Sequence, residues 1–247
     1  MPASNRSRRT YPPLKKSFRL APLGDSAITV EFGDEIDPTI NARAVAFAQA
    51  VVAQRWTGIV DVVPTYRSVT IYYDALQWKS AALANKLKTL PQRVPDDTES
   101  QGTLHEIPVL YGGEYGPDLS DVAAFARLSS DQTVTLHASI RYRVYMLGFS
   151  PGFPYLGLIP ERLAMPRLAT PRAKVPAGSV GIADRQTGIY PTTTPGGWRL
   201  IGRTPIRLYH KTGESPFLLK PGDVVQFKPI DQAEFDRLSH EVSRDDY

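Results

Sequence analysis

The fold of the second half of the chain is decided by the stretch RAKVPAGSVGIADRQTGIY, residues 172–190. Short runs of β-forming residues alternate here with turn formers such as Pro176, Gly178 and Gly188, which exclude a long helix. The same alternation continues through residues 143–229. Many short strands separated by tight turns are typical of closed β structures. The sequence therefore predicts a β-barrel in this half.

Hydrophobic periodicity and turn residues indicate the individual elements of this half. The predicted strands are His105–Tyr111, Arg143–Leu147, Ser179–Ala183, Trp198–Tyr209 and Asp223–Pro229. The predicted helices run from Pro117 to Leu128 and, at the C-terminal end, from Asp231 to Ser243.

The first half shows a different pattern, in which helical and strand periodicities alternate. Residues 18–32 predict a hairpin or two short strands, and Asp37-Pro38 opens a helix with an N-cap residue followed by proline at the first helical position. Two strands at 59–63 and 68–73 and a helix at 81–90 follow. This order predicts a small α/β sandwich, and the chain as a whole is predicted to be α+β.

A polar, proline-anchored stretch at residues 91–103 has the composition of an interdomain linker. We therefore expect four parts, with a domain boundary near residue 100. They are a flexible basic tail at 1–17, the small α/β domain at 18–100, the barrel at 101–230 and a C-terminal helix at 231–247.

The net charge of +4 comes from the first nineteen residues, which contain six Lys or Arg and no acid, so the remainder is slightly acidic. A charged tail of this kind is usually solvated, and we expect no nucleic-acid partner. No apolar run reaches the length of about 20 residues that spans a bilayer, and no secretory leader is recognised. The chain has no cysteine, which is compatible with a reducing cytoplasm.

Several catalytic motifs can be excluded. Residues 148–152 match the G-x-S-x-G pattern of hydrolases, but Pro151 follows the serine and lacks the N–H that such sites use. No phosphate-binding G-x-x-x-x-G-K-[ST] loop occurs, so a conventional ATP cradle is not predicted in this chain. The four histidines lack metal-ligand spacing, and we predict no metal site.

The region between His137 and His210 contains ten Lys or Arg against two acids, which favours an anionic ligand. Arginines and glycines coincide in residues 170–181 and 194–203, where backbone N–H groups could approach such a ligand closely. The alternative is that the glycines form barrel corners and the arginines face water. For the combined segment we predict a binding surface.

Four motifs are similar to a known family: YRVYMLGFSPGFPYLG (142–157), RAKVPAGSVGIADRQTGIY (172–190), TPGGWRLIGRTP (194–205) and LKPGDVVQF (219–227). They resemble the family that contains the B subunit of 5-oxoprolinase, the kinase inhibitor KipI and allophanate hydrolase subunit 1. The resemblance covers nearly the whole chain after about residue 17. Ser150 differs from the leucine of many members.

The resemblance implies a small α/β domain followed by a cyclophilin-like β-barrel, without implying prolyl isomerisation. It further implies a cytoplasmic protein that acts in direct contact with the C subunit of 5-oxoprolinase and together with the A subunit, and that is inactive alone. Such a complex hydrolyses 5-oxo-L-proline to L-glutamate with ATP as co-substrate. The alternatives are a KipI-like inhibitor of histidine kinase autophosphorylation and a component of allophanate hydrolase.

The chemistry of this reaction suggests candidate residues. Phosphorylation of the lactam oxygen by ATP would give an activated imidate-type species that water can open, and all the charged groups involved are anionic. The candidates for catalysis are His137 as acid or base and Arg172, Lys174 and Arg203 as cations. For His137 the alternative is a structural role, because a lone histidine is more often structural. The candidates for substrate binding are Gly178, Gly196 and Gly197 through their backbones, Trp198 and Tyr155 as apolar walls, and Gln186 through its amide.

Overall fold

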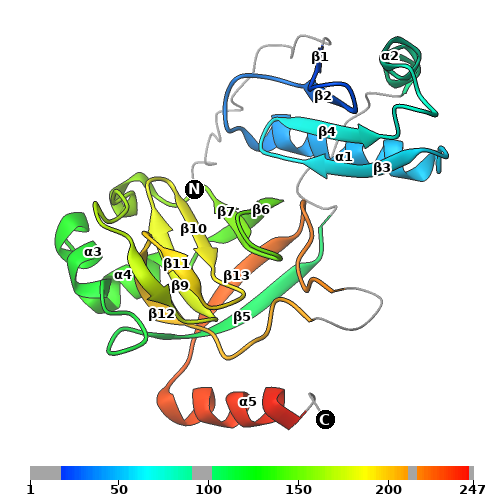
Figure 1. Cartoon of the computed structure of the whole chain (residues 1–247). Helices are drawn as coiled ribbons and strands as arrows, with labels where there is room; N and C mark the ends of the chain where they lie inside the picture. Colours follow the sequence, from blue (N-terminus) through cyan, green and yellow to red (C-terminus); the bar gives the residue numbers. More distant parts are fainter. Residues whose placement is uncertain (1–17, 91–101, 211–215, 245–247) are drawn as a thin grey trace, which may run out of the picture.

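The computed structural model describes residues 18–90, 102–210 and 216–244. They form two domains, an open α/β sandwich and a closed barrel, with a helix lying along the outside of the barrel (Figure 1). The predicted tail at 1–17 and the predicted boundary near residue 100 lie outside these residues. None of the helices in the described ranges combines the length and the apolar character that a membrane span requires.

The N-terminal domain has the predicted order β, α, β, β, α. Its antiparallel sheet has the strand order β1-β2-β4-β3. The strands are β1 (Arg19–Pro22), β2 (Ala27–Glu31), β3 (Ile59–Pro64) and β4 (Ser68–Tyr73), and the helices are α1 (Pro38–Ala53) and α2 (Ser80–Thr89).

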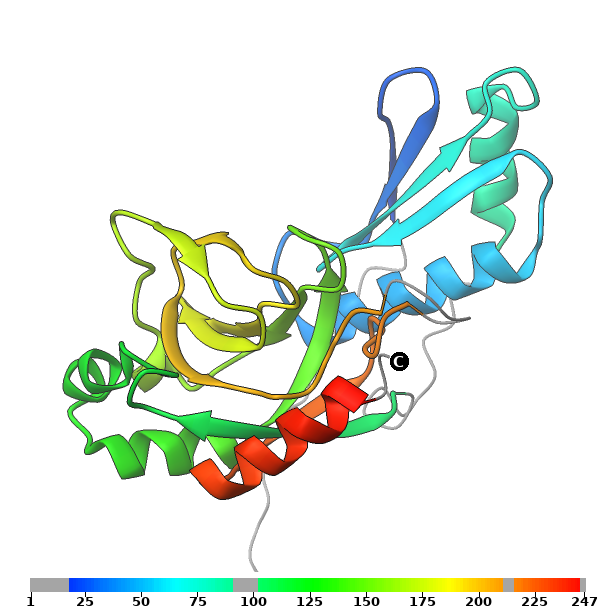
Figure 2. The ribbon, with the colours of Figure 1, turned by 60° about the horizontal axis from the view of Figure 1, so that its bottom comes forward.

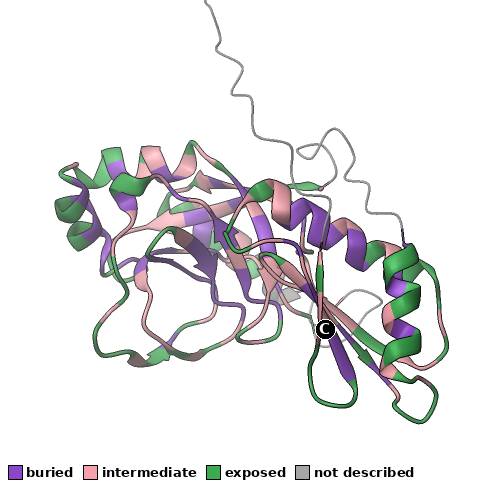
Figure 3. Ribbon diagram, turned by 90° about the horizontal axis from the view of Figure 1, so that it is seen from above, coloured by how far each residue is buried: buried purple, intermediate pink, exposed green. Residues whose placement is uncertain are grey.

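Helix α1 begins where the sequence predicted. Asp37 accepts hydrogen bonds from the backbone N–H groups of Thr39 (2.8 Å) and Ile40 (3.0 Å), and Pro38 occupies the first turn. The buried side of α1 packs Phe47 against the sheet, and its buried residues appear purple in Figure 3. A local capping signal and an apolar face are therefore sufficient to place this helix.

The barrel is closed by seven strands in the order β10-β7-β6-β13-β5-β12-β9, with β9 and β10 paired to complete the circle. Strand β13 lies parallel to β5, so that Leu104 pairs with Val224, 120 residues further along the chain. The strands are β5 (Leu104–Tyr111), β6 (Arg141–Leu147), β7 (Pro154–Gly157), β9 (Ser179–Ala183), β10 (Gln186–Ile189), β12 (Arg199–Arg203) and β13 (Val224–Pro229).

Smaller elements surround the barrel. Figure 2 shows α5 running beside β5 on the outside of the barrel, with α3 and α4 together at another side. These elements are α3 (Leu119–Ala126), α4 (Ser130–Ala138), a 3-10 turn (Glu161–Leu163), the two-stranded sheet of β8 (Arg172–Val175) and β11 (Thr194–Gly196), and α5 (Gln232–Arg244).

The structure differs from the sequence predictions at several elements, since the short strands β7, β8, β10 and β11 were not predicted individually. The strand predicted at 198–209 ends at Arg203, because Pro205 lacks the N–H that a ladder requires. Helix α4 was not predicted at all, although Ser129 and Gln132 form a capping box at its start. The β-branched residues within α4 conceal the helical pattern.

The two domains are joined by hydrogen bonds between side chains and backbone. Asn41 of α1 donates to the carbonyl oxygen of Tyr145 at 2.9 Å and accepts from Nε of Arg143 at 2.9 Å. Tyr66, in the turn between β3 and β4, accepts from the amide of Gln186 at 2.6 Å. One edge of the barrel, at β6 and β10, therefore faces the N-terminal domain.

Candidate functional site

His137 lies in the barrel core and is completely buried, with its ring stacked on Phe227 at 4.7 Å between centroids. Thr187 donates its hydroxyl proton to the carbonyl of Gly181 (3.0 Å), so its oxygen accepts from Nε2 of His137 (3.0 Å). Nδ1 must then be the acceptor, and it receives the hydroxyl proton of Tyr111 at 2.9 Å. These bonds select one neutral tautomer of the ring.

Burial also determines the charge of His137. Desolvation lowers its pKa to about 3, and the ring is therefore neutral near pH 7. A buried neutral imidazole with both nitrogens occupied is not placed to exchange a proton with a substrate. The acid–base role predicted for His137 finds no support in this position, and the residue contributes to the core instead.

Arg172 begins β8 and reaches the start of α3. Its Nη2 donates to Oδ1 of Asp118 at 2.7 Å, and Oδ2 of Asp118 accepts from the backbone N–H of Leu200 at 2.7 Å. The side chain of Asp118 is only 7% exposed. Nη1 of Arg172 is buried and has no acceptor within the described ranges. The charge of Arg172 is thus already balanced inside the chain, whereas Lys174 is exposed to solvent.

Tyr155 and Trp198, both predicted as apolar walls, lie side by side with 5.9 Å between ring centroids. Phe153 contacts both rings, and Tyr190 follows at 5.1 Å from Phe153. A Cβ atom at Gly196 would overlap the hydroxyl of Tyr190, so only glycine fits there. We call Phe153, Tyr155, Tyr190 and Trp198 the aromatic wall.

One of the two N–H donors of the Gln186 amide is already used, because it donates to Tyr66. The ring of Tyr66 lies 5.9 Å from Tyr155, so the aromatic wall continues onto the N-terminal domain. Gly197 has no steric need for glycine, since an added Cβ would meet only ordinary contacts with Pro171.

Arg203 and Gly178 lie in a pocket of about 280 Å³ between the barrel and α5. Gly178 has a φ of +82°, and an added Cβ would overlap the carbonyl oxygen of Thr204. Arg203 donates from Nε to the carbonyl of Ala177 at 2.8 Å, which fixes the direction of its guanidinium. We call this the arginine pocket; the residues that define it are Tyr115, Gly178, Arg203, Arg207, Phe235 and Val242.

The charges around the arginine pocket favour an anion. Arg203 contributes a guanidinium group, and no carboxylate occurs among the described residues that line the pocket. A volume of about 280 Å³ suits a small ring compound or a phosphate group better than a polymer. The predicted residues Arg203 and Gly178 therefore meet in one positively charged pocket.

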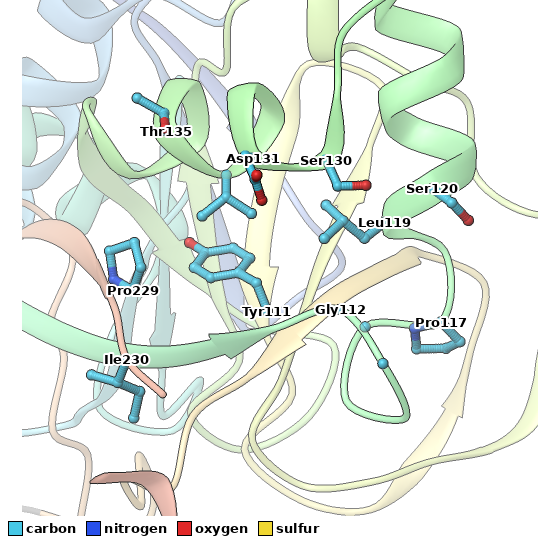
Figure 4. Close-up of a pocket in the computed structure, with 13 residues that line it drawn as sticks. Tyr111, Gly112, Pro117, Leu119, Ser120, Ser130, Asp131, Thr135, Pro229 and Ile230 are labelled. Carbon is cyan, nitrogen blue, oxygen red and sulfur yellow. The ribbon is translucent and has the colours of Figure 1, made fainter. Parts of the chain in front are cut away.

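A larger hollow of about 780 Å³ lies above the ring of Tyr111, and none of the predicted residues lines it. Figure 4 shows Ser130 and Asp131 of α4 facing this space from one side, opposite Gly112 and Ile230. The charged side chain among its described lining residues is Asp131. This hollow is electrostatically unsuited to an anionic ligand.

The predicted candidates thus separate along β12, which runs from Arg199 to Arg203. Trp198 and the aromatic wall lie at the beginning of the strand, and the arginine pocket lies at its end. Two important residues were not predicted, Asp118 and Tyr66. Asp118 was interpreted only as part of a helix start, and no local pattern marks Tyr66 as an interdomain contact.

Comparison with known proteins shows the family to which this chain belongs. Residues 18–219 match the family model of the carboxyltransferase domain, subdomain C and D. The chain is 40% identical to the B subunit of 5-oxoprolinase from Bacillus subtilis over 234 residues, covering 91% of this chain and 98% of that protein. The chain belongs to the family of 5-oxoprolinase B subunits.

The chain also matches another 5-oxoprolinase B subunit, a solved structure and a more distant protein. The Escherichia coli O157:H7 protein of this name is 42% identical over 84% of this chain and 94% of its own length. The solved structure of TTHA0988 is 40% identical with a TM-score of 0.75; the match covers 83% of this chain and 40% of TTHA0988. Urea amidolyase of Saccharomyces cerevisiae is 26% identical over 91% of this chain and only 14% of its own length.

Proposed function

We propose that this protein is the B subunit of an ATP-dependent 5-oxoprolinase that acts in the cytoplasm with the A and C subunits of that enzyme. The observation that carries the proposal is the 40% identity with the Bacillus subtilis B subunit, which extends over 98% of that protein. Such a complex converts 5-oxo-L-proline, ATP and water into L-glutamate, ADP and phosphate. The sequence contains no G-x-x-x-x-G-K-[ST] motif, which is the conventional cradle for ATP phosphates.

The arginine pocket is the part of this chain that suits the substrate. 5-Oxo-L-proline is a small ring that carries one carboxylate, and the guanidinium of Arg203 can bind a carboxylate through two hydrogen bonds. The hollow above Tyr111 has Asp131 in its wall and would repel the same group. Arg172 is balanced by Asp118, so Arg203 is the stronger candidate of the predicted cations.

The first test is reconstitution of the complex. This protein is mixed with its candidate A and C subunits, each omitted in turn, and 5-oxoproline-dependent ATP hydrolysis and glutamate release are measured. We expect activity only when all three are present. If an assembled complex were inactive with 5-oxoproline, allophanate hydrolysis and inhibition of histidine kinase autophosphorylation would be assayed in its place.

Replacement of Arg203 by alanine should raise KM for 5-oxoproline about ten-fold, because one charge-assisted contact with the carboxylate is lost. The value of kcat should change less, since the pocket binds the carboxylate equally in the ground state and in the transition state. Steady-state kinetics of the reconstituted complex would measure both constants.

The matched control is Arg167→Ala, because Arg167 is exposed, belongs to the same basic region and does not line the pocket. Thermal unfolding of both variants excludes a folding defect, since Arg203 also donates to Ala177. An unchanged KM in Arg203→Ala would remove the arginine pocket from the substrate site.

A further inference from the structure

Phe235 of α5 lines the arginine pocket from outside the barrel. It is only 7% exposed, whereas the other described side chains of this helix are partly or fully exposed. Figure 2 shows α5 running beside β5, and residues of both the barrel and this helix line the pocket. The pocket therefore combines a cation from the barrel, Arg203, with an apolar ring from a separate element.

The ring of Phe235 is held in place by the turn that follows β5. It packs on Tyr115 with 4.8 Å between the ring centroids. The N–H groups of Tyr115 (3.1 Å) and Gly116 (2.8 Å) both donate to the carbonyl of Gly112, which fixes this turn. At the start of the helix the N–H of Phe235 donates to the carbonyl of Asp231 at 3.0 Å. The wall that Phe235 forms is therefore in a defined position.

The guanidinium of Arg203 determines where a bound ring would lie. Its Nε donates to the carbonyl of Ala177, and none of the described residues accepts a hydrogen bond from Nη1 or Nη2. These two groups can hold a carboxylate through a pair of parallel hydrogen bonds. In 5-oxoproline the carboxylate is bonded directly to the lactam ring. A ligand bound in this way therefore has its ring inside the pocket, against the other lining side chains.

Much of the remaining wall is apolar and suits the methylene groups of such a ring. Phe235 is the largest of these apolar side chains, and the pocket volume of about 280 Å³ is small beside the range of about 300–1,000 Å³ of ligand sites. The bulk of one phenyl ring thus affects how large a ligand fits. The apolar lining residues are Ala177, Pro191, Pro205, Ile206, Phe235 and Val242.

We propose that Phe235 determines the ring size of the substrate, because it closes the arginine pocket behind a five-membered lactam and excludes larger lactam carboxylates. This inference rests on the proposed function, under which the arginine pocket holds 5-oxoproline. A hydrophobic pocket can discriminate against one additional methylene group by a factor of about 10 to 200. The six-membered lactam homologue of 5-oxoproline, which has one more methylene group, is the compound that this wall should reject.

The test is Phe235→Ala in the reconstituted complex, with 5-oxoproline and its six-membered homologue as substrates. We expect the wild type to prefer 5-oxoproline by at least about ten-fold in kcat/KM. The variant should lose about ten-fold of this preference, since the volume of the phenyl ring becomes available to the additional methylene group. Phe235→Leu is measured beside it and should lose less of the preference; its ratio decides the test if Phe235→Ala does not fold.

The matched control is Leu238→Ala, because Leu238 is a partly buried residue of the same helix that does not line the pocket. Thermal unfolding reports how far each substitution loosens the protein. Leu238→Ala should keep the wild-type ratio of kcat/KM for the two substrates even if its Tm falls. An equal change of this ratio in Leu238→Ala would assign the effect to packing of the helix and overturn the role of Phe235.

Failure of this inference can be distinguished from failure of the proposed function. If the wild-type complex hydrolyses 5-oxoproline but the ratio is unchanged in both Phe235 variants, the role of Phe235 is overturned and the proposed function stands. A wild type that uses both substrates equally well has the same meaning. If an assembled wild-type complex does not hydrolyse 5-oxoproline at all, the proposed function and this inference fail together.

Discussion

Acidification from about pH 6.5 to about pH 4 is expected to lower the free energy of unfolding by about 3 kcal/mol through His137 alone. In the folded protein the pKa of His137 is lowered to about 3 by burial, whereas an unfolded histidine titrates near pH 6.5. Between these values the unfolded chain binds one more proton than the folded chain. The contribution of His137 to the free energy of unfolding is therefore fully present above about pH 6.5 and decreases as the pH falls toward 3.

Urea unfolding of the wild type and of His137→Gln, repeated at several pH values, would isolate this contribution. Carboxylates titrate in both proteins, so the difference between the two slopes of unfolding free energy against pH gives the contribution of His137. His240→Gln is the matched control, because His240 is exposed on α5 and its loss should leave the slope unchanged. Equal pH dependence in wild type and His137→Gln would contradict the buried, neutral state of the ring.

Asp118→Ala should destabilise the protein by about 3 kcal/mol, which corresponds to a fall in Tm of roughly 6–12 °C. The substitution leaves Arg172, whose side chain is partly buried, without its partner and the N–H of Leu200 without an acceptor. If Arg172 is also replaced, as in Asp118→Ala with Arg172→Met, much of this loss should be recovered. Denaturant unfolding of the two single variants and the double variant measures the coupling.

Asp121→Ala provides the control for Asp118. Asp121 lies in the first turn of the same helix, is 59% exposed and approaches Arg199 only to 3.7 Å. Its loss should change the stability by less than about 0.5 kcal/mol. Additive effects of Asp118→Ala and Arg172→Met would show that the ion pair does not hold β8 to α3, and Arg172 would then be available to a ligand.

The N-terminal domain was predictable because its signals are local. Asp37-Pro38 marks the start of α1, and the alternation in 68–73 matches β4. The barrel was predictable as a closed β structure from its turn residues, but the pairing of its strands was not. Which strands pair depends on contacts between segments distant in sequence, such as β5 with β13.

The candidate site was predictable only in part, for a similar reason. The pattern of residues identified Tyr155 and Trp198, which do meet, and Gly178 and Arg203, which share a pocket. It could not show that Asp118 forms an ion pair with Arg172. Nor could it show that Thr187 and Tyr111 form hydrogen bonds with the two ring nitrogens of His137. Burial and pairing of a charged or polar group are set by the tertiary fold, so residue type alone does not reveal them.

The parallel pairing of β5 with β13 has a consequence for biosynthesis. The barrel cannot close until Val224–Pro229 has left the ribosome, because β13 is the strand that joins β5 to β6. The sandwich at 18–90 is complete far earlier and can fold first as a unit. During translation β5 and β6 therefore remain without the strand that joins them for most of the synthesis of the second domain, so the barrel is the later of the two domains to fold.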